Sequence, residues 1–132
     1  MKAGTPSFRA RAGDTRRQGR HWEQVAERIL HKHGLKTLKR NHFARFGEID
    51  LVMLDGETLV FVEVRFRAGR SHGSGADSIT RSKQERIVAA ARHFLMRERG
   101  HALRPCRFDV VSIEKKEGRT VVDWIRSAFE AG

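Results

Sequence analysis

An Asp-Gly pair between two apolar segments is the feature that most constrains the fold of this chain. Apolar residues dominate the sequence on both sides of Asp55-Gly56. This pair, flanked by strand-forming residues, is among the strongest short-range signals for a β-hairpin. We therefore predict two antiparallel strands, Glu48–Leu54 and Thr58–Arg65, at the centre of a sheet.

Each of the two predicted strands carries a carboxylate among apolar residues. Asp50 lies within the first strand and Glu63 within the second. Burying a carboxylate next to Ile, Leu, Val and Phe costs several kcal/mol unless a cation or hydrogen bonds compensate for the lost water. The two acids therefore need a partner, and a divalent metal ion is one such partner.

The register of the hairpin decides whether the two carboxylates meet. A two-residue turn at Asp55-Gly56 pairs Asp50 with Phe61. Because side chains alternate between faces along a strand, Asp50 then shares a face with Glu63, at a diagonal separation of roughly 7–8 Å. A four-residue turn keeps this arrangement, whereas a three-residue turn places the two carboxylates on opposite faces.

Two carboxylates that converge from adjacent strands repel each other unless a cation lies between them. Oxygen ligands favour Mg²⁺ or Mn²⁺ over zinc, so we predict such an ion at Asp50 and Glu63, with the Val64 carbonyl as a further ligand. Glu27, on a preceding helix, is a third candidate acid. A bound divalent ion polarises a phosphodiester and lowers the pKa of bound water. Arg65 would stabilise negative charge that develops on the phosphorus centre.

Structural roles compete with these catalytic ones. Glu63 and Arg65 also fit an ion pair where the sheet meets solvent, and Asp50 also fits a capping residue at a strand end. Glu27 also fits an ordinary surface glutamate on a helix. Lys83 lies at the start of a predicted helix, where a positive charge opposes the helix dipole. That mismatch favours an anionic ligand near Lys83.

The net charge of the chain points to an acidic partner. Lys and Arg total 27 against 16 Asp and Glu, which gives a formal charge of +11. Such an excess favours nucleic acid, an anionic membrane surface or another acidic partner. The charge suggests a phosphate backbone as the partner, and since no stretch approaches the roughly 18 apolar residues of a membrane span, we predict no membrane. The candidate phosphate-binding residues are Arg65, Arg67, Arg70, Arg81 and Lys83.

Length and cysteine content indicate one domain in a reducing compartment. The chain has 132 residues and a single cysteine, Cys106, which excludes an intramolecular disulfide. We therefore expect a cytoplasmic protein. Residues 1–20 are basic and lack apolar periodicity, so they are predicted to form a flexible arm, and residues 21–132 to form the folded domain. Neither a CxxC nor an HExxH zinc pattern occurs.

Apolar periodicity predicts the remaining elements. Helices are expected over His21–His33, which Gly34 terminates, and from Thr80 or Ser82 to Gly100. Further strands are expected over Leu35–Asn41, as a polar edge strand, and over Phe108–Ile113 and Thr120–Ile125. The resulting order predicts an α/β fold, in which a mixed sheet carries helices packed on it.

These residues together resemble the YraN-like family of small bacterial proteins. The resemblance runs from about His21 to Phe129 and rests on the combination of two stretches with several single residues. The matching residues are Gly47-Glu48-Ile49-Asp50-Leu51, Val60-Phe61-Val62-Glu63-Val64-Arg65, Arg107-Phe108-Asp109-Val110-Val111, Asn41, Arg67, Thr80 and Lys83.

The resemblance implies a restriction-endonuclease-like three-layer core, close to that of Holliday-junction resolvases. In that superfamily Asp50 and Glu63 would be the metal ligands and Glu27 the helical acid. Arg65 would occupy the position of a lysine, and Lys83 is a candidate to replace that lysine from the second helix. Ile49 stands where the superfamily motif has proline.

The function that follows is metal-dependent endonucleolytic cleavage of DNA, with branched or junction DNA as a candidate substrate. The alternative is a non-catalytic nucleic-acid-binding protein on the same fold, serving DNA uptake, repair or RNA assembly. Resolution of a junction needs two active sites and hence a homodimer, although the sequence shows no evident dimer face.

Overall fold

The computed structural model of the chain describes residues 12–68 and 79–131. Its elements in chain order are α1 (Ala12–Lys32), β1 (Lys36–Ala44), β2 (Gly47–Asp55), β3 (Thr58–Ala68), α2 (Arg81–Arg97), a short 3₁₀ helix η2 (Arg99–His101), β4 (Cys106–Lys116) and β5 (Arg119–Phe129). The predicted order of one helix, three strands, a second helix and two strands is confirmed.

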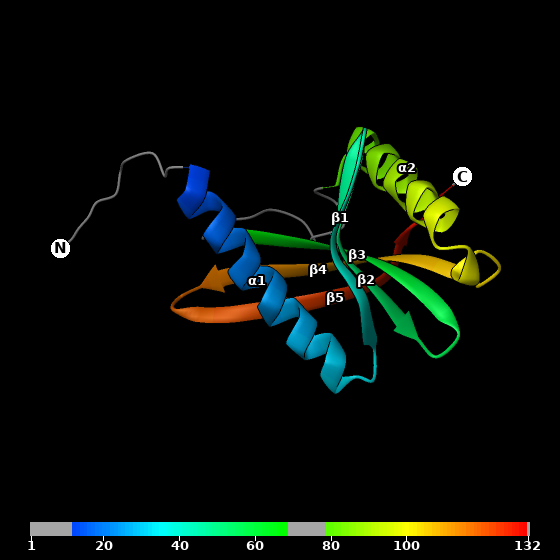
Figure 1. Ribbon diagram of the computed structural model, residues 1–132. Helices are drawn as coiled ribbons and strands as arrows, with labels where there is room; N and C mark the ends of the chain where they lie inside the picture. The colour runs from blue at the N-terminus through cyan, green and yellow to red at the C-terminus, as the bar shows by residue number, and fades with distance from the viewer. Residues whose placement is uncertain (1–11, 69–78, 132) are drawn as a thin grey trace.

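One five-stranded mixed sheet forms the middle layer of the molecule (Figure 1). Its strands lie in the order β1-β2-β3-β4-β5, so β1 is an edge strand, as predicted. The pairing of β3 with β4 is parallel, and all other pairs are antiparallel. A parallel pair needs a crossover, which α2 provides between β3 and β4. The predicted α/β class and the central antiparallel hairpin are confirmed.

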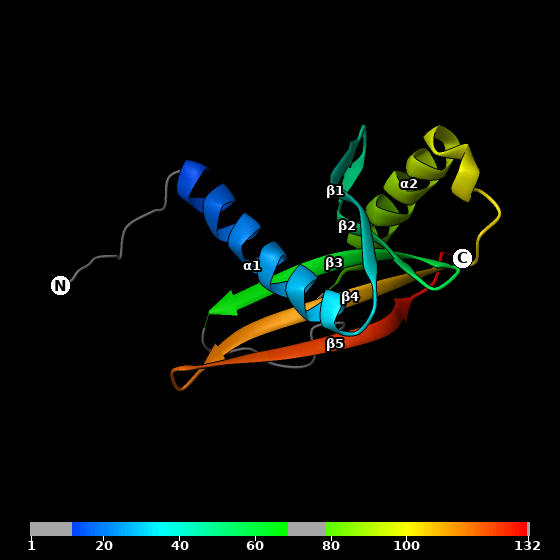
Figure 2. The same cartoon turned by 60° about the horizontal axis from the view of Figure 1, so that its bottom comes forward.

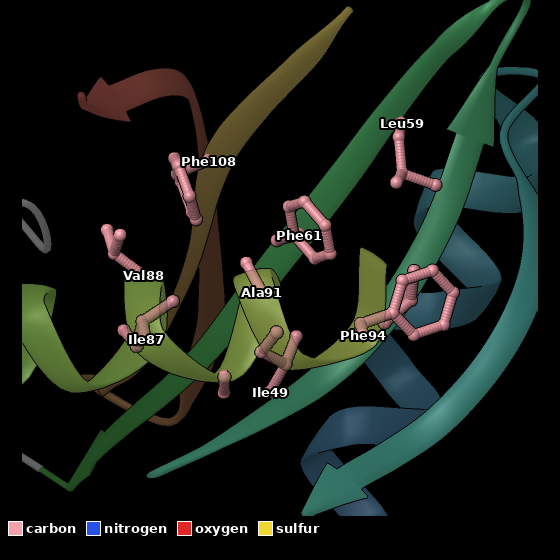
Figure 3. Close-up of a cluster of buried hydrophobic side chains, with 10 residues drawn as sticks. Ile49, Leu59, Phe61, Ile87, Val88, Ala91, Phe94 and Phe108 are labelled. Atoms are coloured by element: carbon pink, nitrogen blue, oxygen red, sulfur yellow. The ribbon is translucent and has the colours of Figure 1, made fainter. Parts of the chain in front are cut away.

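Each helix covers its own face of the sheet with a separate apolar core. The core under α2 contains Ile49, Val52, Leu59, Phe61, Ile87, Val88, Ala90, Ala91, Phe94 and Phe108 (Figure 3). The core under α1 contains Ala26, Leu30, Leu35, Leu51, Met53, Val60, Val62, Val111 and Ile113. Because neighbouring β3 residues such as Phe61 and Val62 belong to different cores, the two helices lie on opposite faces, which gives three layers.

The first helix begins nine residues earlier than predicted. It starts at Ala12 rather than at His21, so residues 12–20, predicted as part of a flexible arm, are helical. The prediction required apolar periodicity, but a helix already anchored by packed residues can extend through solvent-exposed turns. Residues 18–21 are exposed in this way. Residues 1–11 lie outside the described residues.

The two-residue turn of the central hairpin lies one residue later in the chain than predicted. Asp55 pairs with Thr58, and Leu51 pairs with Val62, so the turn consists of Gly56 and Glu57. Gly56 has φ +61°, and Glu57 is not among the residues with positive φ. A positive φ at the first central position alone is the pattern of a type II′ turn. The predicted pairing of Asp50 with Phe61 is therefore wrong by two residues.

The alternation of side chains along β2 breaks at Asp50. Ile49 belongs to the core under α2, whereas Leu51 belongs to the core under α1. In a regular strand these two residues would share a face. The pairing of β2 with β3 extends no further toward the start of β2 than the pair Leu51–Val62.

Beyond the Leu51–Val62 pair the two strands diverge, and we call this point the fork. Figures 1 and 2 show the turn end of the β1–β2 hairpin rising away from the rest of the sheet toward α2, while β3 continues beside β4. Asp50 lies on β2 at the fork, and Glu63 is the first β3 residue beyond it. The break in alternation thus falls at the residue predicted to be functional.

Gly47 allows the start of β2 to approach α2 closely. A Cβ atom at this position would lie 2.4 Å from the carbonyl oxygen of Arg86, in the backbone of α2. We expect Gly47→Ala to lower the free energy of unfolding by about 1–3 kcal/mol, since backbone must move to relieve the overlap. Urea unfolding measures this change. Gly100→Ala is the matched control, because a Cβ there meets nothing within 4 Å, and equal stability of the two variants would contradict the close approach.

Candidate functional site

The structure brings the two predicted acids together at the fork. Asp50 and Glu63 are both buried, each with 8% of its surface exposed. The amide N–H of Val64 donates a hydrogen bond to Asp50 Oδ2 over 2.8 Å, so the carboxylate receives a β3 amide just where β2 leaves the ladder. On the other side, Lys83 Nζ lies 3.5 Å from Glu63 Oε2. The pair is thus held by β2, β3 and the first turn of α2.

Burial and mutual repulsion make this pair electrostatically unusual. Burial raises the pKa of Asp50 well above its ordinary value, and the charge of Glu63 raises it further. Burial also raises the pKa of Glu63, against the opposing charges of Lys83 and Arg65. Asp50 and Glu63 lie close enough for the charge of Glu63 to disfavour ionisation of Asp50. A cation between the two carboxylates would relieve this repulsion.

Glu27, predicted as the helical acid of the site, lies elsewhere. It accepts a hydrogen bond from Arg40 Nε over 2.9 Å and one from the Thr37 hydroxyl, both on β1. Burial favours a higher pKa for Glu27, but the contacts with Arg40 and Thr37 outweigh it and hold the pKa below its ordinary value. The structure therefore corrects the prediction: Glu27 stabilises the α1–β1 contact.

Glu23, one helical turn before Glu27, is the helical acid that reaches the fork. Its Oε1 accepts a hydrogen bond from Asn41 Nδ2 over 2.8 Å, and its charge acts on the neighbouring Asp50. Burial raises the pKa of Glu23, and the charge of Glu48 adds to this. Sequence reasoning missed Glu23, although residues four apart share a helix face. The missing information was which turn of α1 lies over the fork.

The predicted basic residues divide into two groups. Arg65 and Arg67 alternate with Glu63 along β3, so their side chains extend along one face from the acid pair. Arg81, in contrast, is exposed and lines a separate cleft beside the end of the chain, with Gln84 and Arg92. Arg70 lies outside the described residues. The structure therefore places Lys83 and Arg65 beside the acids, with Arg67 further along the same strand and Arg81 at the separate cleft.

The donor set at the fork fits a hydrated Mg²⁺ or Mn²⁺ better than a fully protein-bound ion. Across residues 12–68 and 79–131, no group of three or more His, Cys, Asp or Glu side chains is placed to hold a metal. Mg²⁺ commonly keeps several waters and binds through one or two carboxylates, which Asp50 and Glu63 supply. The predicted ligand role of the Val64 carbonyl stays a prediction, since its observed contact is made through the amide N–H.

Because the pKa of Asp50 is raised, the effect of Asp50→Asn on the free energy of unfolding should depend on pH. Above the raised pKa, ionised Asp50 destabilises the fold, whereas below its ordinary value of 3.8 the group is protonated both folded and unfolded. Asp50→Asn keeps an oxygen acceptor for Val64. We expect it to raise the free energy of unfolding at neutral pH by about 1–3 kcal/mol. The gain should shrink to nothing as the pH falls toward 3.8.

Thermal unfolding of wild type and Asp50→Asn between pH 3.5 and 8, in the absence of divalent ions, measures this dependence. A gain in Tm of roughly 3 °C accompanies each kcal/mol in a domain of this size. A variant that is less stable than wild type at neutral pH would contradict the strained, buried carboxylate.

Comparison with known proteins identifies the relatives of this chain. The sequence model of the family described as "Uncharacterised protein family UPF0102" matches residues 22–113, which include the acid pair, Lys83, β1, β2, β3 and most of β4. The chain belongs to the UPF0102 family. This confirms the relationship that the resemblance to YraN-like proteins indicated.

Several UPF0102 proteins are similar to this chain over most of their length. The protein from Aeromonas hydrophila is 50% identical over 113 residues, covering 85% of this chain and 84% of its own. The protein from Nitrosococcus oceani is 47% identical over 114 residues, covering 86% and 92%. That from Nitrosospira multiformis is 50% identical over 115 residues, covering 87% and 94%.

The helices of the described residues can be compared with the length and apolar character that a membrane span requires. Neither α1 nor α2 is long and apolar enough to cross a membrane. This agrees with the absence of a long apolar stretch in the sequence.

Proposed function

We propose that this UPF0102 protein is a divalent-metal-dependent nuclease that binds DNA and cleaves its phosphodiester backbone, with branched or junction DNA as the preferred substrate. The observation that carries the proposal is the buried pair of Asp50 and Glu63, which converge at the fork beside Lys83. Perturbed carboxylates that converge beside a cation are characteristic of functional sites.

The chemistry of the site follows from its own residues. Asp50 and Glu63 would hold Mg²⁺ or Mn²⁺ between them, and the ion would supply an activated water and a Lewis acid. The Val64 amide fixes the orientation of Asp50, and Glu23 lies beside it. Lys83 and Arg65, whose charges already act on Glu63, would neutralise the phosphate group as negative charge develops.

Arg65 cannot supply the proton-accepting group that a lysine at this position of β3 could supply. A guanidinium stays protonated at any accessible pH and cannot take a proton from water. The superfamily resemblance implies a lysine at this position, and Lys83 supplies the nearest ammonium group, 3.5 Å from Glu63. We therefore assign phosphate binding to Arg65 and the lysine role to Lys83. The three-layer core with a central hairpin is the arrangement that a restriction-endonuclease-like fold requires.

One observation favours a non-catalytic DNA-binding protein instead. Lys83 supplies the acid pair with a cation from within the protein, so the fold does not depend on a metal for charge balance. On this alternative the acids shape the surface and the basic residues bind the phosphate backbone. The formal charge of +11 supports both functions equally.

Labelled linear duplex, single-stranded and four-way-junction DNA, titrated with Mg²⁺ and Mn²⁺, distinguishes the two functions. The nuclease predicts cleavage by wild type that Asp50→Asn loses while it retains DNA affinity. Binding should weaken steeply with added salt, since basic residues contact phosphates. DNA binding without cleavage in either metal would favour the non-catalytic function.

Junction cleavage carries a further requirement. Two strands must be cut, so two copies of the chain must act on one junction. Sedimentation of the protein with and without a four-way junction measures this assembly. A single copy on the junction would restrict the proposal to cleavage of one strand.

A further inference from the structure

Two phenylalanines stand exposed at the turn end of the β1–β2 hairpin. Phe43 is 67% exposed and Phe46 is 65% exposed, among the largest exposed apolar side chains in the described residues. Phe46 and Arg45 form the turn, and the guanidinium carbon of Arg45 lies 5.1 Å from the centre of the Phe46 ring. Exposed aromatic rings next to arginine are a favourable surface for stacking.

The hairpin end and α2 enclose an open cleft of about 370 Å³. Phe43, Phe46 and Ile87 give it an apolar lining, and Lys83 and Arg86 place two positive charges in its wall. Both helix-borne cations lie in the first two turns of α2, where the helix dipole adds to the positive potential. The cleft thus combines flat apolar surface with sites for an anion.

The cleft adjoins the acid pair. Lys83 lines the cleft and also lies 3.5 Å from Glu63. Phe43 and Glu48 border this cleft and also a second one on the α1 side, which Glu23 lines. Figures 1 and 2 show the hairpin end projecting beyond β3, β4 and β5. A strand bound across the fork would therefore meet the two rings next to the site of cleavage.

The close contact of Gly47 with α2 holds the hairpin end in place. Its Cα approaches the Arg86 carbonyl so closely that no side chain fits between them. The rings are consequently presented on a fixed support instead of a free loop, and little ordering is needed when a ligand binds.

We propose that this cleft binds an unpaired nucleobase of a DNA strand, stacked on Phe43 and Phe46, with the adjoining phosphate at Lys83 and Arg86. The inference rests on the proposed function and adds its substrate preference: single-stranded segments and branch points over continuous duplex. A paired base in a duplex cannot expose its face, whereas an unpaired base stacks on an aromatic ring in any sequence. Self-association through the same rings would bring the cations of two cleft walls together, which like-charge repulsion disfavours.

Fluorescence anisotropy with a labelled 30-base single strand and the same sequence as a duplex tests the cleft, with Ca²⁺ in place of Mg²⁺ to prevent cleavage. We expect the double variant Phe43→Ala/Phe46→Ala to lose about 10-fold or more in affinity for the single strand. Its affinity for the duplex should change by less than about twofold, because the phosphate contacts remain. Phe43→Tyr/Phe46→Tyr should restore the affinity for the single strand.

Leu103→Ala is the matched control, since Leu103 is 99% exposed and lies between η2 and β4, away from the cleft. An equal loss for single strand and duplex, or no loss, overturns the stacking cleft while the nuclease proposal stands if wild type still cleaves. A monomeric double variant beside a dimeric wild type assigns the rings to self-association and also overturns it. Failure of wild type to bind either DNA overturns both proposals.

Discussion

Replacing Asp109 by alanine is expected to lower the free energy of unfolding by about 3–5 kcal/mol, the largest stability change of any substitution considered for this chain. Asp109 is completely buried. Its carboxylate accepts hydrogen bonds from Arg107 Nε at 3.0 Å, from Trp124 Nε1 at 2.9 Å and from the Ser127 amide at 3.0 Å. Alanine would remove the shared acceptor of these three donors from a completely buried position.

The three donors explain why an acid is needed between β4 and β5. The register of the two strands shifts between Phe108 and Val110, and Ser127 has φ +50°. The irregular backbone leaves amides outside the ladder, and Asp109 binds one of them. Arg107, the charged donor of the three, also contacts Asp55 Oδ2 at 3.0 Å and so connects β4 to the central hairpin.

Equilibrium unfolding in urea measures this loss. Asp123→Ala, at an exposed position of β5, is the control and should change stability by less than about 0.5 kcal/mol. Asp109→Asn, which keeps one carbonyl oxygen, should fall between wild type and alanine. Similar stabilities for the alanine variants at 109 and 123 would show that the network contributes nothing beyond the neighbouring packing.

Replacing Glu63 by glutamine is expected to reduce the rate of metal-dependent DNA cleavage by at least about 100-fold. The amide has the shape of the carboxyl group but no negative charge for a divalent ion. The fold should persist, because glutamine removes a buried carboxylate whose pKa burial has raised. The rate of cleavage of a labelled junction, measured at saturating protein and 10 mM Mg²⁺, gives the result.

Glu27→Gln is the matched control on the neighbouring acid. Glu27 contacts Arg40 and Thr37 instead of Asp50 or Glu63, so its substitution should leave the cleavage rate within about twofold of wild type. Equal losses in both variants would contradict the assignment of the two acids. A loss of cleavage in Glu27→Gln alone would support Glu27 as the helical acid of the site, the role that the superfamily resemblance implied.

The sequence predicted the fold well because the fold depends on local patterns. Two helical periodicities and the Asp55-Gly56 pair between apolar strands each express a short-range preference. Strand and helix ends were less accurate, since the packed centre of an element allows polar ends to extend. The helical extension of α1 back to Ala12 is the clearest case.

The sequence predicted correctly that Asp50 and Glu63 lie close together. The strand geometry from which this was predicted differs from the observed one. The regular alternation assumed for β2 gave Asp50 and Glu63 a common face, whereas the observed strand breaks its alternation at Asp50 and the turn residues are Gly56 and Glu57. The break in β2 lies near Gly47, which packs against the backbone of α2, and no local pattern predicts such a contact between distant segments.

The helical acid could not be assigned from sequence. Glu23 and Glu27 lie on the same side of α1, one turn apart, and both flank the apolar residues that pack on the sheet. Only the position of α1 along the sheet decides which of them reaches Asp50. The structure gives this role to Glu23 and pairs Glu27 with β1.

Binding of Mn²⁺ at the fork tests the central claim most directly. Electron paramagnetic resonance of free Mn²⁺ counts the bound ions in wild type, Glu63→Gln and Glu27→Gln without requiring any DNA. If Asp50 and Glu63 are metal ligands, wild type and Glu27→Gln should each bind one Mn²⁺ ion. In Glu63→Gln this site should be absent or at least about 10-fold weaker. Equal Mn²⁺ binding by all three proteins would contradict a metal site at the fork.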